Sequence, residues 1–182
     1  MRLSKRSKYG LLALIDLATH NDHKPVPLKE LAERNHIPPK FLEQIFLTLR
    51  NAGIVHSQVG LGGGYTLGRP ADTISVGEVI RILDGTIAPV SCVSRIAYEP
   101  CTCPDEQSCP LRAVMSRVRD AIVAVIDTTS LADAVALGRT LSLSAPADQL
   151  LKQGSCSPYA MASRPERSER SERSRRAAKQ YQ

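Results

Sequence analysis

The chain has 182 residues and a formal net charge of +6, from 24 lysines and arginines against 18 acidic residues. Aromatic residues make up 4%, tryptophan is absent, and no run approaches the ~18 apolar residues of a membrane span. This composition excludes a membrane-spanning helix and favours a helical fold with an aliphatic core. The basic charge suits a polyanionic partner, or a basic surface that is merely solvated.

The amino terminus is basic and then apolar, which raises the question of a signal peptide. Asp16 interrupts the apolar run, and no small-residue cleavage site follows it. We therefore expect a cytoplasmic protein with no membrane partner. In that compartment cysteines stay reduced, so clustered cysteines indicate metal or redox chemistry rather than structural disulfides.

Apolar residues at helical spacing predict three helices in the first part of the chain, at 4–20, 28–35 and 39–51. Pro39 suits the first turn of the third helix, and Gly53 supplies its stop. Two short helices joined by a tight turn are typical of a helix-turn-helix, although any helical hairpin gives the same pattern. The outer face of the third helix carries Lys40, Glu43, Gln44, Leu47 and Thr48.

Two short strands, expected at 54–59 and 65–69, flank a glycine-rich run at 60–64. A β-hairpin directly after the second helix of such a pair is the layout of a winged helix, whose wing tip lies near the DNA backbone or minor groove. The glycine run lacks the Gly-Lys-Ser/Thr ending of a phosphate-binding loop and leads into a strand. A nucleotide site is therefore not expected.

The segment Ser75–Glu78 is a capping box that opens a further helix, which Gly85 ends. Four of the five cysteines then fall within an eighteen-residue, proline-interrupted loop. They are Cys92, Cys101, Cys103 and Cys109. An irregular loop can turn several sulfurs toward one point, which suits a soft metal or an iron–sulfur cluster.

These residues leave three alternatives open for the cysteines. They could hold an iron–sulfur cluster, or a structural zinc ion, which four thiolates satisfy equally well. They could also form a metal-free thiol switch, in which Cys101 and either Cys103 or Cys109 make a reversible disulfide. The fifth cysteine, Cys156, has no assigned role.

From Leu111 to Ile126 apolar residues recur every three or four positions over about four turns. A stripe of this length predicts a dimer interface, the alternative being packing within one subunit. Ser130 caps a last helix running to about Leu137. Beyond it, the Arg/Ser/Glu repeat at 163–179 has almost nothing to bury and is expected to be disordered.

The predicted fold is mainly α with a small β-hairpin wing: a winged helix-turn-helix head plus a long dimerisation helix. We divide the chain into a DNA-binding domain (1–85), a cysteine-rich sensor loop (86–110), dimerisation helices (111–140) and a disordered basic tail (141–182). No nucleophile–base constellation, dinucleotide fingerprint or paired carboxylate is found, so an enzyme is not expected. The rival to a DNA-binding regulator is an interaction adaptor that uses this fold without DNA.

Five motifs carry a resemblance to a known family: Lys8–Gly10, Phe41–Gln44, Leu49–Gly53, Gly62–Tyr65 and Ser75–Glu78. On these motifs, residues 1–140 resemble the bacterial Rrf-type (IscR-, NsrR- and RirA-like) winged helix-turn-helix transcription regulators. The resemblance implies a homodimer with crossed long helices that binds double-stranded DNA at a palindromic promoter site. It also implies an iron–sulfur cluster, [2Fe–2S] or [4Fe–4S], held on cysteines between head and stalk.

The resemblance implies that Glu43 accepts a hydrogen bond from a cytosine amino group, a pairing that groove chemistry allows. The residues expected to bind DNA are Lys40, Glu43, Gln44, Thr48, Gly62, Gly63 and Tyr65. The wing departs from the family pattern, because Val59 stands where many relatives carry an arginine. Lys8 replaces an acidic residue that some members lend to the partner's cluster, which closes that route to a fourth ligand.

For the cluster, the resemblance matches Cys92, Cys103 and Cys109 to the three ligands of the family. Arg112, which cannot ligate, stands where IscR-like members have a histidine. Cys101 is then the candidate fourth ligand of an all-thiolate site. The expected function is a homodimeric DNA-binding transcription regulator whose DNA affinity is controlled by an iron–sulfur cluster or by thiol redox state.

Overall fold

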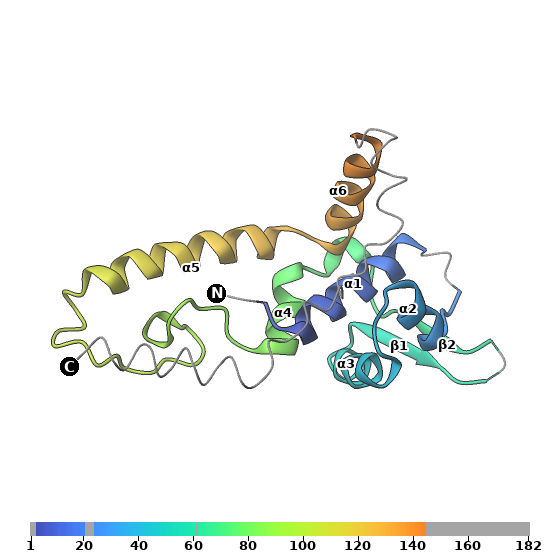
Figure 1. Ribbon diagram of the computed structural model, residues 1–182, viewed down its shortest axis with the longest axis horizontal. Helices are drawn as coiled ribbons and strands as arrows, with labels where there is room; N and C mark the ends of the chain where they lie inside the picture. Colours follow the sequence, from blue (N-terminus) through green and yellow to red (C-terminus); the bar gives the residue numbers. More distant parts are fainter. Residues whose placement is uncertain (1–2, 21–23, 61, 145–182) are drawn as a thin grey trace, which may run out of the picture. The chain divides into compact units, whose positions relative to one another are not determined.

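The computed structural model describes residues 3–20, 24–60 and 62–144 (Figure 1). In these residues six α-helices accompany one two-stranded antiparallel sheet and two 3-10 turns. The helices are α1 (Lys5–Thr19), α2 (Leu28–Arg34), α3 (Pro39–Asn51), α4 (Val76–Asp84), α5 (Pro110–Thr128) and α6 (Leu131–Ser144). The strands are β1 (Val55–Gln58) and β2 (Gly64–Leu67), and the turns are η1 (Ala71–Thr73) and η2 (Ser91–Val93).

The first three helices form the predicted helix-turn-helix around an aliphatic core. Ser4 caps α1 by accepting the backbone N–H of Ser7 at 3.1 Å. His36 turns the chain between α2 and α3 with a left-handed φ of 52°, and Pro39 begins α3. The buried side chains of α3 are Leu42, Ile45, Phe46 and Leu49, which join Leu14 of α1 and Leu31 of α2 in one cluster.

The wing is the hairpin of β1 and β2, paired in the register Val55↔Leu67 through Gln58↔Gly64. The strands cover 55–58 and 64–67, where 54–59 and 65–69 were predicted. Ile54 is buried in the core, Val59 is fully exposed beyond the end of β1, and β2 begins one residue earlier than predicted, at Gly64. The segment before α2 adds an isolated bridge to the hairpin. The predicted winged helix-turn-helix head is therefore confirmed.

Helix α6 begins against the head, a contact that the sequence did not predict. The backbone N–H of Leu131 donates to the carbonyl of Ile74 at 2.9 Å, and the side chain of Leu131 is fully buried in the core of the head. The helix also runs to Ser144, past the predicted end near Leu137 and into the region expected to be disordered. Residues 145–182, with Cys156 and most of the predicted tail, lie outside the described residues.

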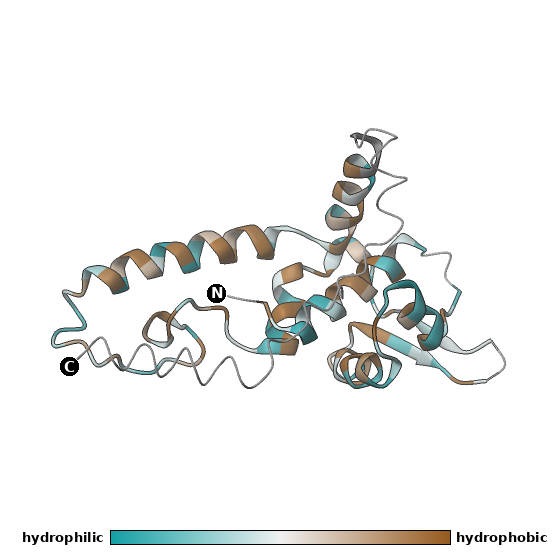
Figure 2. Cartoon of the chain, in the orientation of Figure 1, coloured by the Kyte–Doolittle hydropathy of each residue, from teal (hydrophilic) through white to brown (hydrophobic). Residues whose placement is uncertain are grey.

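Helix α5 carries the predicted apolar stripe with most of it uncovered. None of its residues is fully buried, and Figure 2 shows apolar positions recurring along its length. The exposed members of the stripe are Leu111, Val114, Val118 and Val125. No helix in the part of the chain that the structure describes has the length and hydropathy to cross a bilayer.

Candidate functional site

The outward face of α3 gathers three of the predicted DNA-binding residues. Lys40, Glu43 and Gln44 are all exposed, one helical turn apart at most, on the side opposite the buried leucines and isoleucine. A glutamate accepts from the amino group of cytosine, a glutamine pairs with adenine, and a lysine suits a phosphate. This surface has the chemistry that reading a major groove requires.

Thr48 is placed differently from the other predicted residues of α3. Its side chain is half-buried, its Oγ1 accepts a hydrogen bond from Arg6 Nη2 at 2.6 Å, and it donates to the carbonyl of Gln44 at 3.2 Å. The neighbouring Leu47 is instead 47% exposed. Helical spacing placed both residues on the outer face. It could not reveal that Arg6 of α1 hydrogen-bonds to the hydroxyl of Thr48.

The predicted DNA-binding residues of the wing lie in two places: Gly62 and Gly63 at its tip, and Tyr65 where the wing packs on the head. Gly62 is exposed with φ +83° and Gly63 is half-exposed, so both lie where the backbone can approach a duplex. The ring of Tyr65 packs edge-on against Phe46 with centroids 5.0 Å apart. The backbone of Tyr65 exchanges two hydrogen bonds with Val26, so this residue also holds the wing onto the head.

Arg50 is an exposed cation that the sequence reading did not select. It lies at the last turn of α3, with its Nη1 3.5 Å from Ser57 Oγ of β1. A basic residue between α3 and the wing is suited to a phosphate contact. Its position in the Leu49–Gly53 motif was the available signal.

Each of the four loop cysteines interacts with the next one along the chain. The Sγ atoms of Cys103 and Cys109 are 3.8 Å apart, and the Cys101 thiol interacts with both Cys103 and the buried Cys92. They form a chain of pairs: across the described residues no three His, Cys, Asp or Glu side chains are arranged to hold a metal ion. The spacing therefore supplies neighbouring thiols, with Cys92 and Cys109 at the two ends.

The thiols differ in their affinity for protons. Hydrogen bonding with Cys101 and then with Cys109, together with burial, raises the pKa of Cys103 to about 12. The pKa of Cys109, which is the N-cap of α5, is lowered chiefly by the backbone N–H of Arg112. Burial raises the pKa of Cys92. The amino end of α5 thus favours a thiolate at Cys109.

Arginines of α5 anchor the cysteine loop. Arg112 Nε donates to the carbonyl of Cys92 at 3.3 Å and forms an ion pair with Glu106 at 3.3 Å. Arg119 donates to the carbonyl of Val93. Arg112 thus secures the backbone beside one of the cysteines.

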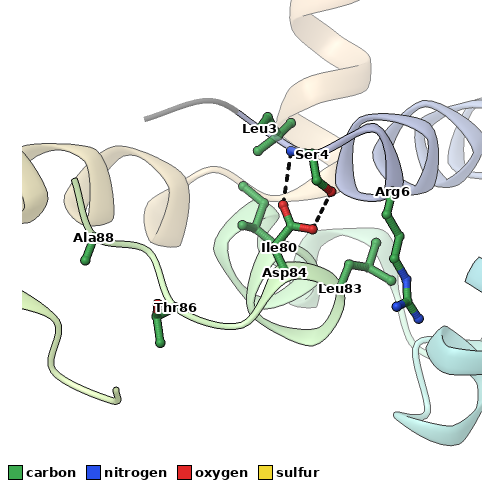
Figure 3. A pocket seen from close by; sticks show the side chains of 8 residues that line it. All are labelled: Leu3, Ser4, Arg6, Ile80, Leu83, Asp84, Thr86 and Ala88. Carbon is green, nitrogen blue, oxygen red and sulfur yellow. Dashed lines mark hydrogen bonds between the residues drawn. The ribbon is translucent and has the colours of Figure 1, made fainter. Parts of the chain in front are cut away.

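A cavity of about 620 Å³ lies between the amino end of α1 and the carboxyl end of α4 (Figure 3). It is lined by Leu3, Ser4, Arg6, Ile80, Leu83, Asp84, Thr86 and Ala88. The backbone N–H and hydroxyl of Ser4 both donate to the carboxylate of Asp84, at 3.2 and 2.5 Å. Thr86 and Ala88 already belong to the cysteine-bearing loop, so the cavity marks the junction of head and loop.

Comparison with known proteins identifies the relatives of this chain. A family model, Rrf2, described as an iron-dependent transcriptional regulator, matches residues 3–137. An Rrf2-like HTH-type transcriptional regulator of Rhodobacter capsulatus is 38% identical over 154 residues, which cover 82% of this chain and 99% of the relative.

Solved structures agree with the sequence comparison. CymR of Bacillus subtilis, described as the global cysteine regulator, matches with a TM-score of 0.65 and 36% identity over 75% of this chain and 98% of that chain. IscR of T. potens matches with a TM-score of 0.61 and 30% identity over 83% of this chain and 96% of that chain.

Proposed function

The chain belongs to the Rrf2 family of DNA-binding transcriptional regulators, and on that basis we propose that it is a homodimer whose DNA affinity is controlled at its cysteine loop. The family resemblance found in the sequence is confirmed, as is the prediction that the chain is not an enzyme. The partner we propose is double-stranded DNA with a palindromic promoter site, bound in the cytoplasm.

The observation that carries the DNA-binding proposal is the outward face of α3. Its exposed residues Lys40, Glu43 and Gln44 stand on a helix whose other face is locked into the core. Two such helices in a symmetric dimer would read two half-sites in successive major grooves. We propose that Gly62 and Gly63 of the wing, with Arg50, contact the adjacent backbone.

We propose that Cys92, Cys101, Cys103 and Cys109 hold an iron–sulfur cluster. Two thiolates on one tetrahedral metal ion with metal–sulfur distances of about 2.3 Å lie about 3.8 Å apart. The 3.8 Å between the Sγ atoms of Cys103 and Cys109 supports two ligands on one ion. When bound, such a cluster supplies a redox-active centre where the head joins α5. Zinc would take the same thiolates and is the alternative occupant.

A metal-free thiol switch is the second candidate function, favoured by the same pair of cysteines. In it the thiols of Cys103 and Cys109 lose two protons and two electrons to a peroxide or disulfide oxidant, and one S–S bond forms. The pKa of Cys109 is lowered, which suits the attacking thiolate. The similar protein CymR of Bacillus subtilis is described as a global cysteine regulator.

In either case the residues around the loop would transmit its state. Arg112 and Arg119 hold the backbone at Cys92 and Val93 onto α5, and Arg81 of α4 pairs with Asp127 of α5. We propose that a change at the thiols alters this anchoring and with it the orientation of the two recognition helices. The affinity for paired half-sites would change accordingly.

Anaerobic purification with metal analysis and DNA binding tests the proposal. We expect a coloured, iron-containing protein whose affinity for a selected duplex differs between the loaded and metal-free forms and falls steeply with salt. Alanine at Cys92, Cys103 or Cys109 should abolish the colour, and Cys101→Ala tests the fourth ligand. A colourless zinc protein would favour zinc. A metal-free protein that loses two thiols on oxidation would favour the switch, and a protein that binds no duplex would be an adaptor.

A further inference from the structure

We propose that Leu47 is a specificity-determining residue that packs against the 5-methyl group of a thymine in the major groove. This inference rests on the proposed DNA-binding function and deepens it, because it adds an apolar base contact to the polar ones of α3. The relevant observation is an apolar side chain exposed on the face that is otherwise polar.

Leu47 is one of four exposed large apolar side chains among the described residues from 3 to 84. The others are Leu3, Leu12 of α1 and Val59 of the wing, so Leu47 is the one that lies on α3. The other leucines of α3, Leu42 and Leu49, are fully buried. An isolated exposed leucine is common on protein surfaces, so its position must decide its meaning.

That position continues the base-reading face. Leu47 follows Glu43 and Gln44 by four and three residues, which is the spacing of neighbours on one face of a helix. Thr48 is half-buried and contacts Arg6 of α1, whereas the neighbouring Leu47 is exposed. Uncharged and without donors, it can contribute to base reading only through apolar contact, and the thymine methyl is the apolar group in the major groove.

The helix geometry places the contacted base. Four residues advance α3 by about 6 Å, and base pairs rise by about 3.4 Å. If Glu43 accepts from a cytosine, the thymine lies one or two base pairs farther along the groove. Each half-site of a palindrome would carry one such thymine.

Methyl deletion in the DNA tests this contact without changing any hydrogen bond. A duplex would first be selected from random sequences with the full-length, anaerobically purified protein. Each thymine would then be replaced in turn by deoxyuridine, which lacks only the 5-methyl group. We expect one position per half-site at which this replacement weakens binding about fourfold, and about fifteenfold in both half-sites, as for one buried methyl group each.

Variants assign the effect to Leu47. Leu47→Ala should bind the thymine duplex more weakly and the two duplexes equally, whereas Leu47→Met should keep the difference. Leu137→Ala, which truncates an exposed leucine of α6, is the matched control and should leave the ratio unchanged.

The outcomes separate this inference from the function beneath it. Salt-sensitive binding with no thymine-methyl dependence, or a methyl dependence that persists in Leu47→Ala, would overturn the role of Leu47 and leave the DNA-binding proposal standing. A change in subunit count of Leu47→Ala without DNA would assign the residue to self-association instead. Failure to bind any duplex would overturn both.

Discussion

Single residues where α4 meets α5 show how the head is held to the long helix α5. Arg81 donates to both carboxylate oxygens of Asp127, at 2.7 and 2.8 Å, in a two-pronged pairing. This hydrogen bonding, more than the charge itself, lowers the pKa of Asp127. Gly77 faces the same carboxylate, and an added Cβ would collide with it. The glycine therefore leaves room for the Asp127 carboxylate in its pairing with Arg81.

The lowered pKa of Asp127 predicts a pH-dependent stability. Its stabilisation is fully present above the unfolded pKa of about 3.9 and is lost as pH falls through the lower folded value. The carboxylate is 39% exposed, so we expect Asp127→Asn to cost only about 0.5–1 kcal/mol at pH 7. Urea unfolding of both proteins at pH 7, 5 and 3 measures the difference.

Arg81→Lys is the control for this prediction. It keeps the positive charge beside Asp127 but loses the two-pronged geometry, so it should retain part of the stability and the same direction of pH dependence. A deficit of Asp127→Asn that stayed constant down to pH 3 would contradict the assignment.

Gly64 predicts a different kind of defect in the wing. A Cβ there would overlap the backbone of Val26 and lie 2.8 Å from the nitrogen of Pro27. Gly64→Ala must separate the wing from that segment, and we expect it to lower the free energy of unfolding by about 1–3 kcal/mol. Gly62→Ala, which meets open space at φ +83°, should cost about 1 kcal/mol of backbone strain.

Thermal or urea unfolding of the two glycine variants separates these causes. Gly64→Ala should lose more stability, while Gly62→Ala should show its larger effect on DNA affinity if the wing tip meets the duplex. Equal losses of stability would mean that the backbone of residues 26 and 27 yields easily.

At the scale of elements, the amino end of α1 contacts both α3 and the end of α4 from which the cysteine loop continues. Ser4, its cap, holds Asp84 at the end of α4, and Arg6 holds Thr48 of α3. Both contacts lie on the first turn of α1, at the rim of the cavity that Thr86 and Ala88 complete. This helix is therefore placed to pass a change in the loop to α3.

We expect Arg6→Ala to weaken the coupling between the state of the cysteine loop and the DNA affinity of α3. We expect the iron content to stay unchanged while the ratio of DNA affinities between loaded and metal-free protein falls about fivefold toward one. Titration of both forms with one duplex measures the ratio. Arg50→Ala is the matched control, since losing a phosphate contact should weaken both forms in parallel. A parallel loss in Arg6→Ala would make Arg6 a plain DNA contact.

The elements also show what sequence reasoning could reach. Helical spacing, the Ser4 and Ser75 caps and the Pro39 start are local signals, and they located α1 to α4 within a few residues. Contacts between distant positions have no such signal. Ser4 and Asp84 are 80 residues apart, and Leu131 returns to the core of the head across the whole loop and α5.

The candidate site divides along the same line. Periodicity identified the exposed Lys40, Glu43 and Gln44 of α3, because their direction follows from the helix alone. It placed Thr48 and Leu47 on the same outer face, and it could not show that Arg6 of α1 contacts Thr48 while Leu47 stays exposed. For the cysteines, spacing predicted proximity, and the pairing order from Cys92 to Cys109 came from the fold of the loop.

At the scale of the whole molecule, the uncovered stripe of α5 argues for a second subunit. Leu111, Val118 and Val125 repeat every seven residues, with Val114 three positions after the first, as in the seam of two packed helices. All four side chains are between 40% and 64% exposed in the single chain. A row of such residues left in water would be unfavourable, and a copy of the same helix would cover it with self-complementary packing.

The stripe predicts that a charge at its centre dissociates the dimer. Val118→Glu would bury two unpaired carboxylates in the seam, and we expect the dissociation constant to rise at least a hundredfold. Sedimentation equilibrium of the full chain measures it. Val59→Glu, at the fully exposed wing position, is the control and should stay dimeric.

Because palindromic recognition needs two linked heads, Val118→Glu should also lose most of its affinity for the paired half-sites while still binding a single half-site weakly. A Val118→Glu protein that remained dimeric would assign the interface to another face of the molecule.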